Sequence, residues 1–203
     1  LESCRKAVAS GNIRDAEILF CGGGASLYGK NHPDGMPPFE GTTAQSVTDY
    51  LILNQRLLLD RIKGDDRLTR HITALPGMAQ LRTTRCIAGD YSLKEADRYR
   101  HFEDSVGAIG DFERCDIIYE VPYRCLVRRG YDNLIAAGRC AAAEGYAWDV
   151  LRVIPPAILT GQAAGLAAGQ AAGAGRPMAD LDVRQLQKEL AATGVMIHFD
   201  ESL

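Results

Sequence analysis

The chain has 203 residues with a formal net charge of −3, and 46% of them are hydrophobic. This balance favours one large or two small folded domains and argues against a disordered chain or a nucleic-acid-binding surface. The six cysteines include no Cys-x-x-Cys pair, so we expect free thiols in a cytoplasmic protein, without a disulfide scaffold or a zinc ribbon. The first 14 residues are polar and of mixed charge, which predicts no signal peptide.

The first forty residues carry few regular signals. A helix is expected up to about Ala16, followed by a short strand at residues 18–20. Six glycines and three prolines in residues 22–41 then indicate a loop. The glycine triplet at residues 22–24 follows the strand as in a dinucleotide-binding turn, but no helical pattern comes after it, so we predict a loop here too.

One long helix is predicted in the middle of the chain. Thr42 or Thr43 caps it, it runs to about Lys63, and Gly64 closes it in the C′ position. Short strands around a turn are expected over residues 68–88, and the capping-box spacing at 92–95 predicts the start of a short helix. A β-rich run follows over 117–127, with Pro122 marking a bend or an edge, and a short buried strand is expected over 133–138. Near the C-terminus we expect a helix capped by Asp182 and ended by Gly194, and then a final strand over 195–199.

The segment from residue 152 to residue 173 is rich in Ala and Gly and predicts a helix with Pro155 and Pro156 in its first turn. Each glycine in a helix interior lowers its stability by about 1 kcal/mol relative to Ala. We therefore expect the glycine ridge to face another backbone or a flat ligand at close range. A helix packed on a sheet is favoured over a membrane span, because polar residues and the two prolines interrupt the apolar run. The ridge consists of Gly161, Gly165, Gly169 and Gly173.

Other chemical signals are weaker. The four histidines show no ligand spacing, so no metal site is predicted. For residues 101–104, an exposed helix end is favoured over an acid–base site. Arginines at strand ends bind carboxylates or phosphates, with surface salt bridges as the alternative, and the candidates are Arg82, Arg85, Arg124 and Arg139.

Four segments carry a family resemblance. They are residues 81–91 (Leu-Arg-Thr-Thr-Arg-Cys-Ile-Ala-Gly-Asp-Tyr), residues 102–107, residues 121–127 running into 133–139, and residues 151–155 followed by 160–165. Together they resemble the C-terminal half of the FAD-dependent oxidoreductases whose flavin fold is related to glutathione reductase and fumarate reductase. The last two segments are specific in order and spacing, and the resemblance spans about Thr42 to Gly194.

The resemblance implies an α+β or α/β fold. Residues 1–128 would hold an N-terminal loop region and part of a mixed β-rich substrate (cap) domain, and residues 129–203 the C-terminal part of the FAD-binding domain. It implies FAD as the cofactor of the full-length protein. The family's GxGxxG turn has no counterpart here, so we expect a fragment that is inactive by itself, and the first residue, Leu1 rather than Met, agrees with this expectation.

The resemblance also implies which residues meet the ligands. Gly138 and the residue after it would reach the flavin and its ribityl chain, and residues 152–155 would follow the pyrimidine edge. The next helix would point its positive end at the N1–C2=O edge, where the reduced flavin gains negative charge. The expected cofactor-binding residues are Gly138, Arg139, Arg152, Val153, Ile154, Pro155, Gly161 and Gln162. The expected substrate contacts are Arg82, Arg85, Tyr123, Arg124, Tyr146 and Asp149, and no catalytic residue is assigned.

The expected function is hydride transfer between a small-molecule substrate and flavin, with homo-oligomers allowed and with neither a nucleic acid nor a membrane as partner. The alternative is a non-catalytic binding module that keeps the flavin-domain ending without the cofactor. That alternative predicts an exposed hydrophobic face and association through it.

Overall fold

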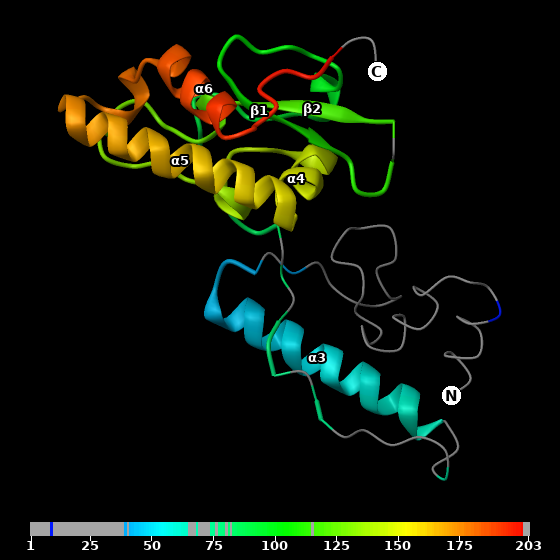
Figure 1. The fold of residues 1–203 in the computed structure, drawn as a ribbon. Helices are drawn as coiled ribbons and strands as arrows, with labels where there is room; N and C mark the ends of the chain where they lie inside the picture. Colours follow the sequence, from blue (N-terminus) through cyan, green and yellow to red (C-terminus); the bar gives the residue numbers. More distant parts are fainter. Residues whose placement is uncertain are drawn as a thin grey trace. The chain divides into compact units, whose positions relative to one another are not determined.

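The computed structural model describes residues 9, 39, 41–64, 68, 74–75, 77–79, 81, 83–114 and 116–200. The chain divides into two compact units, Leu1–Thr84 and Arg85–Leu203, which are described separately (Figure 1). Apart from residue 9, which is helical, the predicted first helix, first strand and glycine triplet lie outside the described residues. The second unit contains residues from both sides of position 128, so the predicted division into substrate and FAD portions stays a prediction.

In the first unit, the predicted long helix is confirmed as α3, Ala44–Lys63. Thr43 is extended, and its hydroxyl accepts the N–H of Ser46 at 3.2 Å, which satisfies one donor of the first turn. Gly64 ends the helix as predicted, but it is the C-cap residue, with φ −78° in the right-handed region, and not the expected C′ residue.

In the second unit, β1 (Ser105–Gly110) pairs antiparallel with β2 (Ile118–Pro122), and Ile109 lies opposite Tyr119. The predicted bend at Pro122 is confirmed, because the strand ends there and a 3₁₀ turn follows at Tyr123–Cys125. This is the only sheet among the described residues, so a β-rich substrate domain is not found in that part of the chain.

The strands predicted in three segments are wrong in the part of the chain that the structure describes. Each lacks the continuous ladder of backbone bonds that a strand needs. In residues 68–88, Ile87 forms a single backbone bond, to the Cys140 carbonyl at 2.8 Å. Residues 133–138 pair with a neighbour through one isolated bridge at Ile135 and end in a 3₁₀ turn, Gly138–Cys140. Residues 195–199 approach β1 through one backbone bond, from Ala108 N to the Met196 carbonyl, and one side-chain bond, from the Ser105 hydroxyl to the Ile197 carbonyl.

Two predicted helix features are shifted or wrong. The helix expected from residue 92 is a 3₁₀ turn, Glu95–Asp97, because the Asp97 carboxylate accepts the Lys94 N–H at 2.9 Å and moves the capping box two residues onward. The helix end expected at residues 101–104 is a turn, because this segment leads directly into β1.

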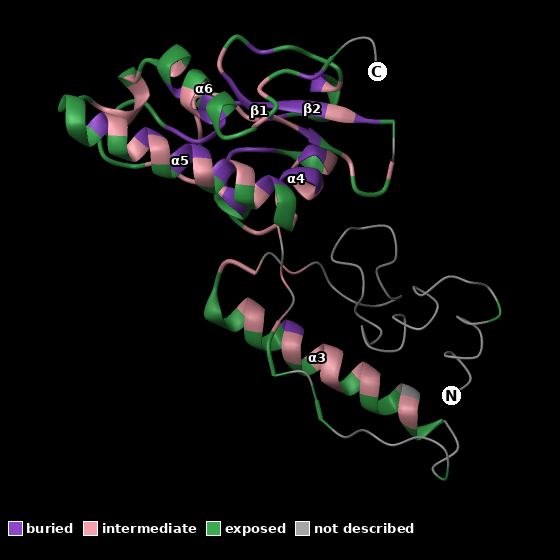
Figure 2. Ribbon diagram, in the orientation of Figure 1, coloured by how far each residue is buried: buried purple, intermediate pink, exposed green. Residues whose placement is uncertain are grey.

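The second unit also contains three helices: α4 (Gly145–Leu151), α5 (Ile154–Ala174) and α6 (Val183–Ala192). Of these, α5 and α6 pack on β1, and α4 packs on α5 and on the 3₁₀ turns at Glu95–Asp97 and Gly138–Cys140. The predicted cap of α6 is confirmed, since Asp182 accepts the N–H groups of the two residues after Val183. Figure 2 shows that buried residues are concentrated on the strands and on one side of the helices. The core includes Val106, Tyr119, Val121, Val150, Ala163, Ala167, Leu186 and Leu190.

No single helix of the described residues is long and apolar enough to cross a membrane. By length and composition alone, α4 and α5 together would qualify as a broken span, with a bend of 78° between them.

Candidate functional site

Gly138 is held against the beginning of α5. Its N–H donates to the hydroxyl of Thr160 at 2.9 Å, and that hydroxyl donates to the Pro156 carbonyl at 2.7 Å. Both Gly138 and Thr160 are buried. A buried N–H is costly when unpaired, so this bond fixes the loop that contains Gly138 to the first two turns of the helix.

A side chain at position 138 would be strained. Gly138 has φ +62°, in the left-handed region that glycine adopts without penalty. A Cβ added there would lie 3.3 Å from the Ala157 Cβ. The loop can therefore approach α5 this closely because position 138 is glycine.

The first turn of α5 is accessible. Val153 is its N-cap in extended backbone and makes no side-chain cap, and Ile154 is 76% exposed. Since Pro155 and Pro156 have no N–H, Ile154 is the only backbone donor among the first three helical positions. The helix dipole places partial positive charge at this end, which suits the electron-rich edge of a planar ligand.

The arginines predicted at the cofactor have structural partners. Arg152 is only 10% exposed, and its Nε donates to the Asp149 carboxylate at 2.9 Å. Arg139 is exposed, and its backbone carbonyl accepts the indole N–H of Trp148 at 3.0 Å. These contacts join α4 to the loop before it and to the start of α5.

The glycine ridge of α5 is exposed. Gln162, beside it, donates from Nε2 to the Thr193 hydroxyl at 2.7 Å. No described atom outside the helix lies within 4 Å of a Cβ built at any ridge position. The predicted close approach therefore has no partner among the described residues, and the packing on the sheet is made by the alanine face instead.

Two of the predicted substrate residues line a cavity of about 490 Å³. Arg124 forms two hydrogen bonds with the Asp104 carboxylate, at 2.9 and 3.1 Å, and these raise the pKa of the guanidinium. Burial raises the pKa of Tyr123 to about 12, and its hydroxyl donates to the Met178 carbonyl at 2.8 Å. Further charged residues of the lining are Asp90, Arg100, Glu103 and Arg129.

The other predicted substrate residues are not brought to this cavity. Tyr146 lies on α4 and donates to Asp111 at 3.0 Å, and burial together with this bond raises its pKa to about 12. Asp149 is paired with Arg152, as described above. Arg85 is exposed at the start of the second unit, and Arg82 lies outside the described residues.

The described cysteines of the second unit are free thiols that differ in burial. Cys125 is fully buried, and burial raises the pKa of its thiol, so it stays protonated. Cys86 and Cys140 are free thiols with partial or full exposure.

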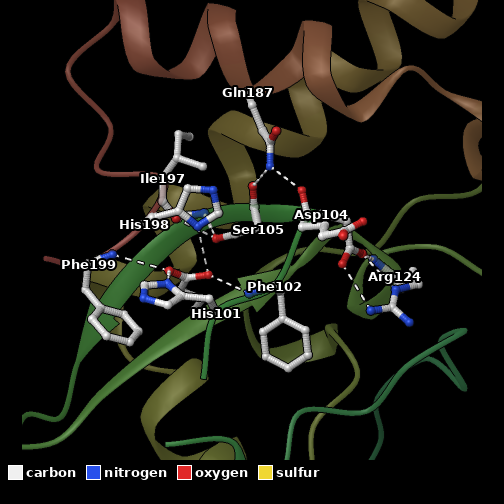
Figure 3. A network of polar contacts seen from close by, with 12 residues as sticks. His101, Phe102, Asp104, Ser105, Arg124, Gln187, Ile197, His198 and Phe199 are labelled. Atoms are coloured by element: carbon white, nitrogen blue, oxygen red, sulfur yellow. Dashed lines mark hydrogen bonds and ion pairs between the residues drawn. The ribbon is translucent and has the colours of Figure 1, made fainter. Parts of the chain in front are cut away.

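The sequence analysis missed a polar network around Glu120, a fully buried residue of β2. Its carboxylate contacts the Nδ1 atoms of His101 at 2.6 Å and of His198 at 3.0 Å. It also accepts the N–H groups of Phe102 at 2.8 Å and Phe199 at 3.3 Å. Figure 3 shows the two His-Phe pairs converging from the turn before β1 and from the C-terminal segment. The repeated His-Phe pair, at residues 101–102 and 198–199, is a sequence signal that could have indicated this site.

The comparisons give the class of protein. The family model described as FAD dependent oxidoreductase matches residues 48–190. The search of curated proteins found no match, and neither did the search of solved structures. Because the matched region covers most of the chain, this protein belongs to the FAD dependent oxidoreductase family.

Proposed function

We propose that this chain forms the isoalloxazine side of the FAD site in an oxidoreductase that transfers hydride between a small-molecule substrate and flavin. FAD, when bound, supplies the two-electron chemistry that no side chain provides. Family membership supports the cofactor and the reaction type. The proposal also includes the small-molecule substrate, a cytoplasmic location, and a further segment, attached to this chain, that binds the FAD pyrophosphate.

The observation that carries the proposal is the junction of Gly138 with α5. Gly138, buried and left-handed, is bonded to Thr160, and the accessible first turn of α5 begins beside it. These features fit a planar ligand with a polarised edge, because the loop brings backbone close while the helix end favours negative charge. The residues proposed to hold the ring are Gly138, Arg139, Val153, Ile154 and Pro155.

The substrate side of the proposal rests on charge. Tyr123 and Arg124 border the cavity, which also contains Arg100 and Arg129. Each of these three arginines is already paired with an acid, namely Asp97, Asp104 or Asp180. A small polar molecule that carries both an acidic and a basic or hydroxyl group suits such an alternating lining.

A binding module without cofactor is the competing function. Ile154 and Ile158 are 76% and 65% exposed on one side of α5, and an apolar face of this kind suits a protein partner or a second copy of the chain. Purification of the intact natural protein separates the two functions. Visible flavin absorbance, or its appearance after FAD is added, supports the enzyme. A protein that has no flavin bands and takes up no FAD supports the binding module and overturns our proposal.

Two matched glycine variants locate the flavin. Gly138 and Gly175 both have φ +62°, so Ala at either position should lower stability by about 1–2 kcal/mol, with the larger loss at position 138, where the added Cβ would lie 3.3 Å from the Ala157 Cβ. Only Gly138→Ala adds a side chain at the proposed site, so it should also weaken flavin retention. Retention is measured as the flavin fraction left after dialysis, at a temperature where both variants are folded. Equal retention in the two variants would contradict the placement of the ring beside Gly138.

A further inference from the structure

The Glu120 network contains three side chains with the ligand atoms of a transition-metal site. One atom from each of His101, Glu120 and His198 lies within 4.8 Å of the others. Two imidazoles and one carboxylate are a donor set that Zn²⁺ uses, with bonds of about 2.0–2.2 Å. The Nδ1 atoms of the two histidines already lie 2.6 and 3.0 Å from the Glu120 oxygens, so an ion would have to enter between them and widen these distances slightly, and the histidine side chains, 38% and 46% exposed, can shift to allow it.

The carboxylate is oriented before any ion arrives. The N–H groups of Phe102 and Phe199 each bond one of its two oxygens. The ring of His101 also stacks on the ring of Phe199, with centroids 4.2 Å apart. Such supporting contacts fix the direction of metal ligands and raise affinity for the ion. The remaining face of the carboxylate is turned toward the two imidazoles.

Charge favours a cation at this place. Glu120 is fully buried, and no Lys or Arg of the described residues forms an ion pair with it. Neutral imidazoles can donate hydrogen bonds to the carboxylate but leave its negative charge without compensation, which is costly in a buried site. A divalent ion would compensate that charge and keep both imidazoles as ligands.

We propose that His101, Glu120 and His198 form a binding site for a divalent ion of the Zn²⁺ class. Three protein ligands leave one tetrahedral position open, and the exposed histidines allow water to fill it. The site joins the turn before β1, strand β2 and the C-terminal segment, which are separated by up to 97 positions in the sequence. This separation is why the spacing of the histidines in the sequence did not predict the site. The proposal is independent of flavin, because none of its ligands belongs to the Gly138 junction.

The test uses the untagged full chain after treatment with a chelator. Co²⁺ should bind with a stoichiometry of one and give visible d–d absorption, and Zn²⁺ should displace it and raise the melting temperature. A thiolate-to-Co²⁺ charge-transfer band would mean that cysteines bind the ion, and it would overturn the proposal. Absence of both the absorption and the Zn²⁺-dependent shift in melting temperature would also overturn it, and the network would then serve only as hydrogen bonds that hold the three segments together.

The informative variant is His198→Gln, which keeps an N–H donor for Glu120 but removes a good metal ligand. If the network is a metal site, Zn²⁺ affinity should fall by more than about 100-fold while the metal-free protein keeps its melting temperature. A second variant, Glu120→Gln, removes the carboxylate ligand, and Glu103→Gln is its control, because it removes the same charge from an exposed position nearby. Unchanged Co²⁺ spectra in His198→Gln would contradict the assignment, whether or not Glu120→Gln folds.

Discussion

The two faces of α5 are both made of small residues, but for different reasons. Ala163 and Ala167 are fully buried in the core of the second unit. Gly161 and Gly165 are exposed, and a Cβ at either would meet nothing within 4 Å among the described residues. On the alanine face, neighbouring side chains fill the space and limit residue size. On the glycine face, the described chain gives no such limit, so a ligand or another segment is the remaining reason for glycine.

The largest expected difference between the faces is in tolerance to leucine. Ala167→Leu should lower the free energy of unfolding by about 1–3 kcal/mol, because the added carbons have no space in the core. Gly165→Leu should leave stability unchanged or raise it by up to about 1 kcal/mol, since leucine is the better helix former. Urea denaturation of both variants measures the difference. Similar losses in the two would mean that the glycine face is also packed.

The comparison shows what the sequence can predict. The span of α5 and the prolines in its first turn followed from local rules, and so did the caps at Thr43 and Asp182. Which face is buried depends on contacts between distant elements. The four-residue spacing of the glycines places them on one face of the helix but does not determine whether that face is buried or exposed. The strand predicted over residues 133–138 failed for a related reason, because strand formation depends on a neighbour and not on the segment alone.

A second expected difference is between a buried and an exposed tyrosine of the second unit, in how each affects stability at alkaline pH. Burial raises the pKa of Tyr123 to about 12, from an ordinary value near 10. The unfolded chain therefore loses this proton at lower pH than the folded one. The stabilising contribution is complete below about pH 10 and is lost as pH rises toward about 12.

Tyr123→Phe isolates this contribution. At neutral pH it should lower stability by about 1 kcal/mol, because the hydrogen bond to the Met178 carbonyl is lost. Between about pH 10 and about pH 12 its stability should fall less steeply than that of the parent protein. Tyr131→Phe, at an exposed residue, should leave the pH profile as it is. Parallel profiles for the parent and Tyr123→Phe would mean that Tyr123 does not control the alkaline loss.

The candidate sites were predictable to different degrees. The family resemblance predicted that Gly138 and residues 154–155 share a site, and the structure bonds Gly138 to Thr160 in the first two turns of α5. The Glu120 network could not be found by spacing, because His101 and His198 meet only through the fold of β1, β2 and the C-terminal segment. Local patterns predict sites built from one turn or helix, whereas sites built from distant segments require the tertiary structure.

The smallest expected change in stability offers the sharpest test of the glycine face. Gly161→Leu places a large side chain about two turns beyond the accessible start of α5, where no described atom outside the helix lies within 4 Å of the added Cβ. Its stability should remain within about 0.5 kcal/mol of the parent or rise. If the flavin lies against this end of the helix, the leucine should reduce FAD retention by the intact natural protein. Gly173→Leu, on the same ridge three turns away, should not. Loss of retention in both variants would point to a long segment covering the whole ridge, and loss in neither would place the flavin away from the glycine face.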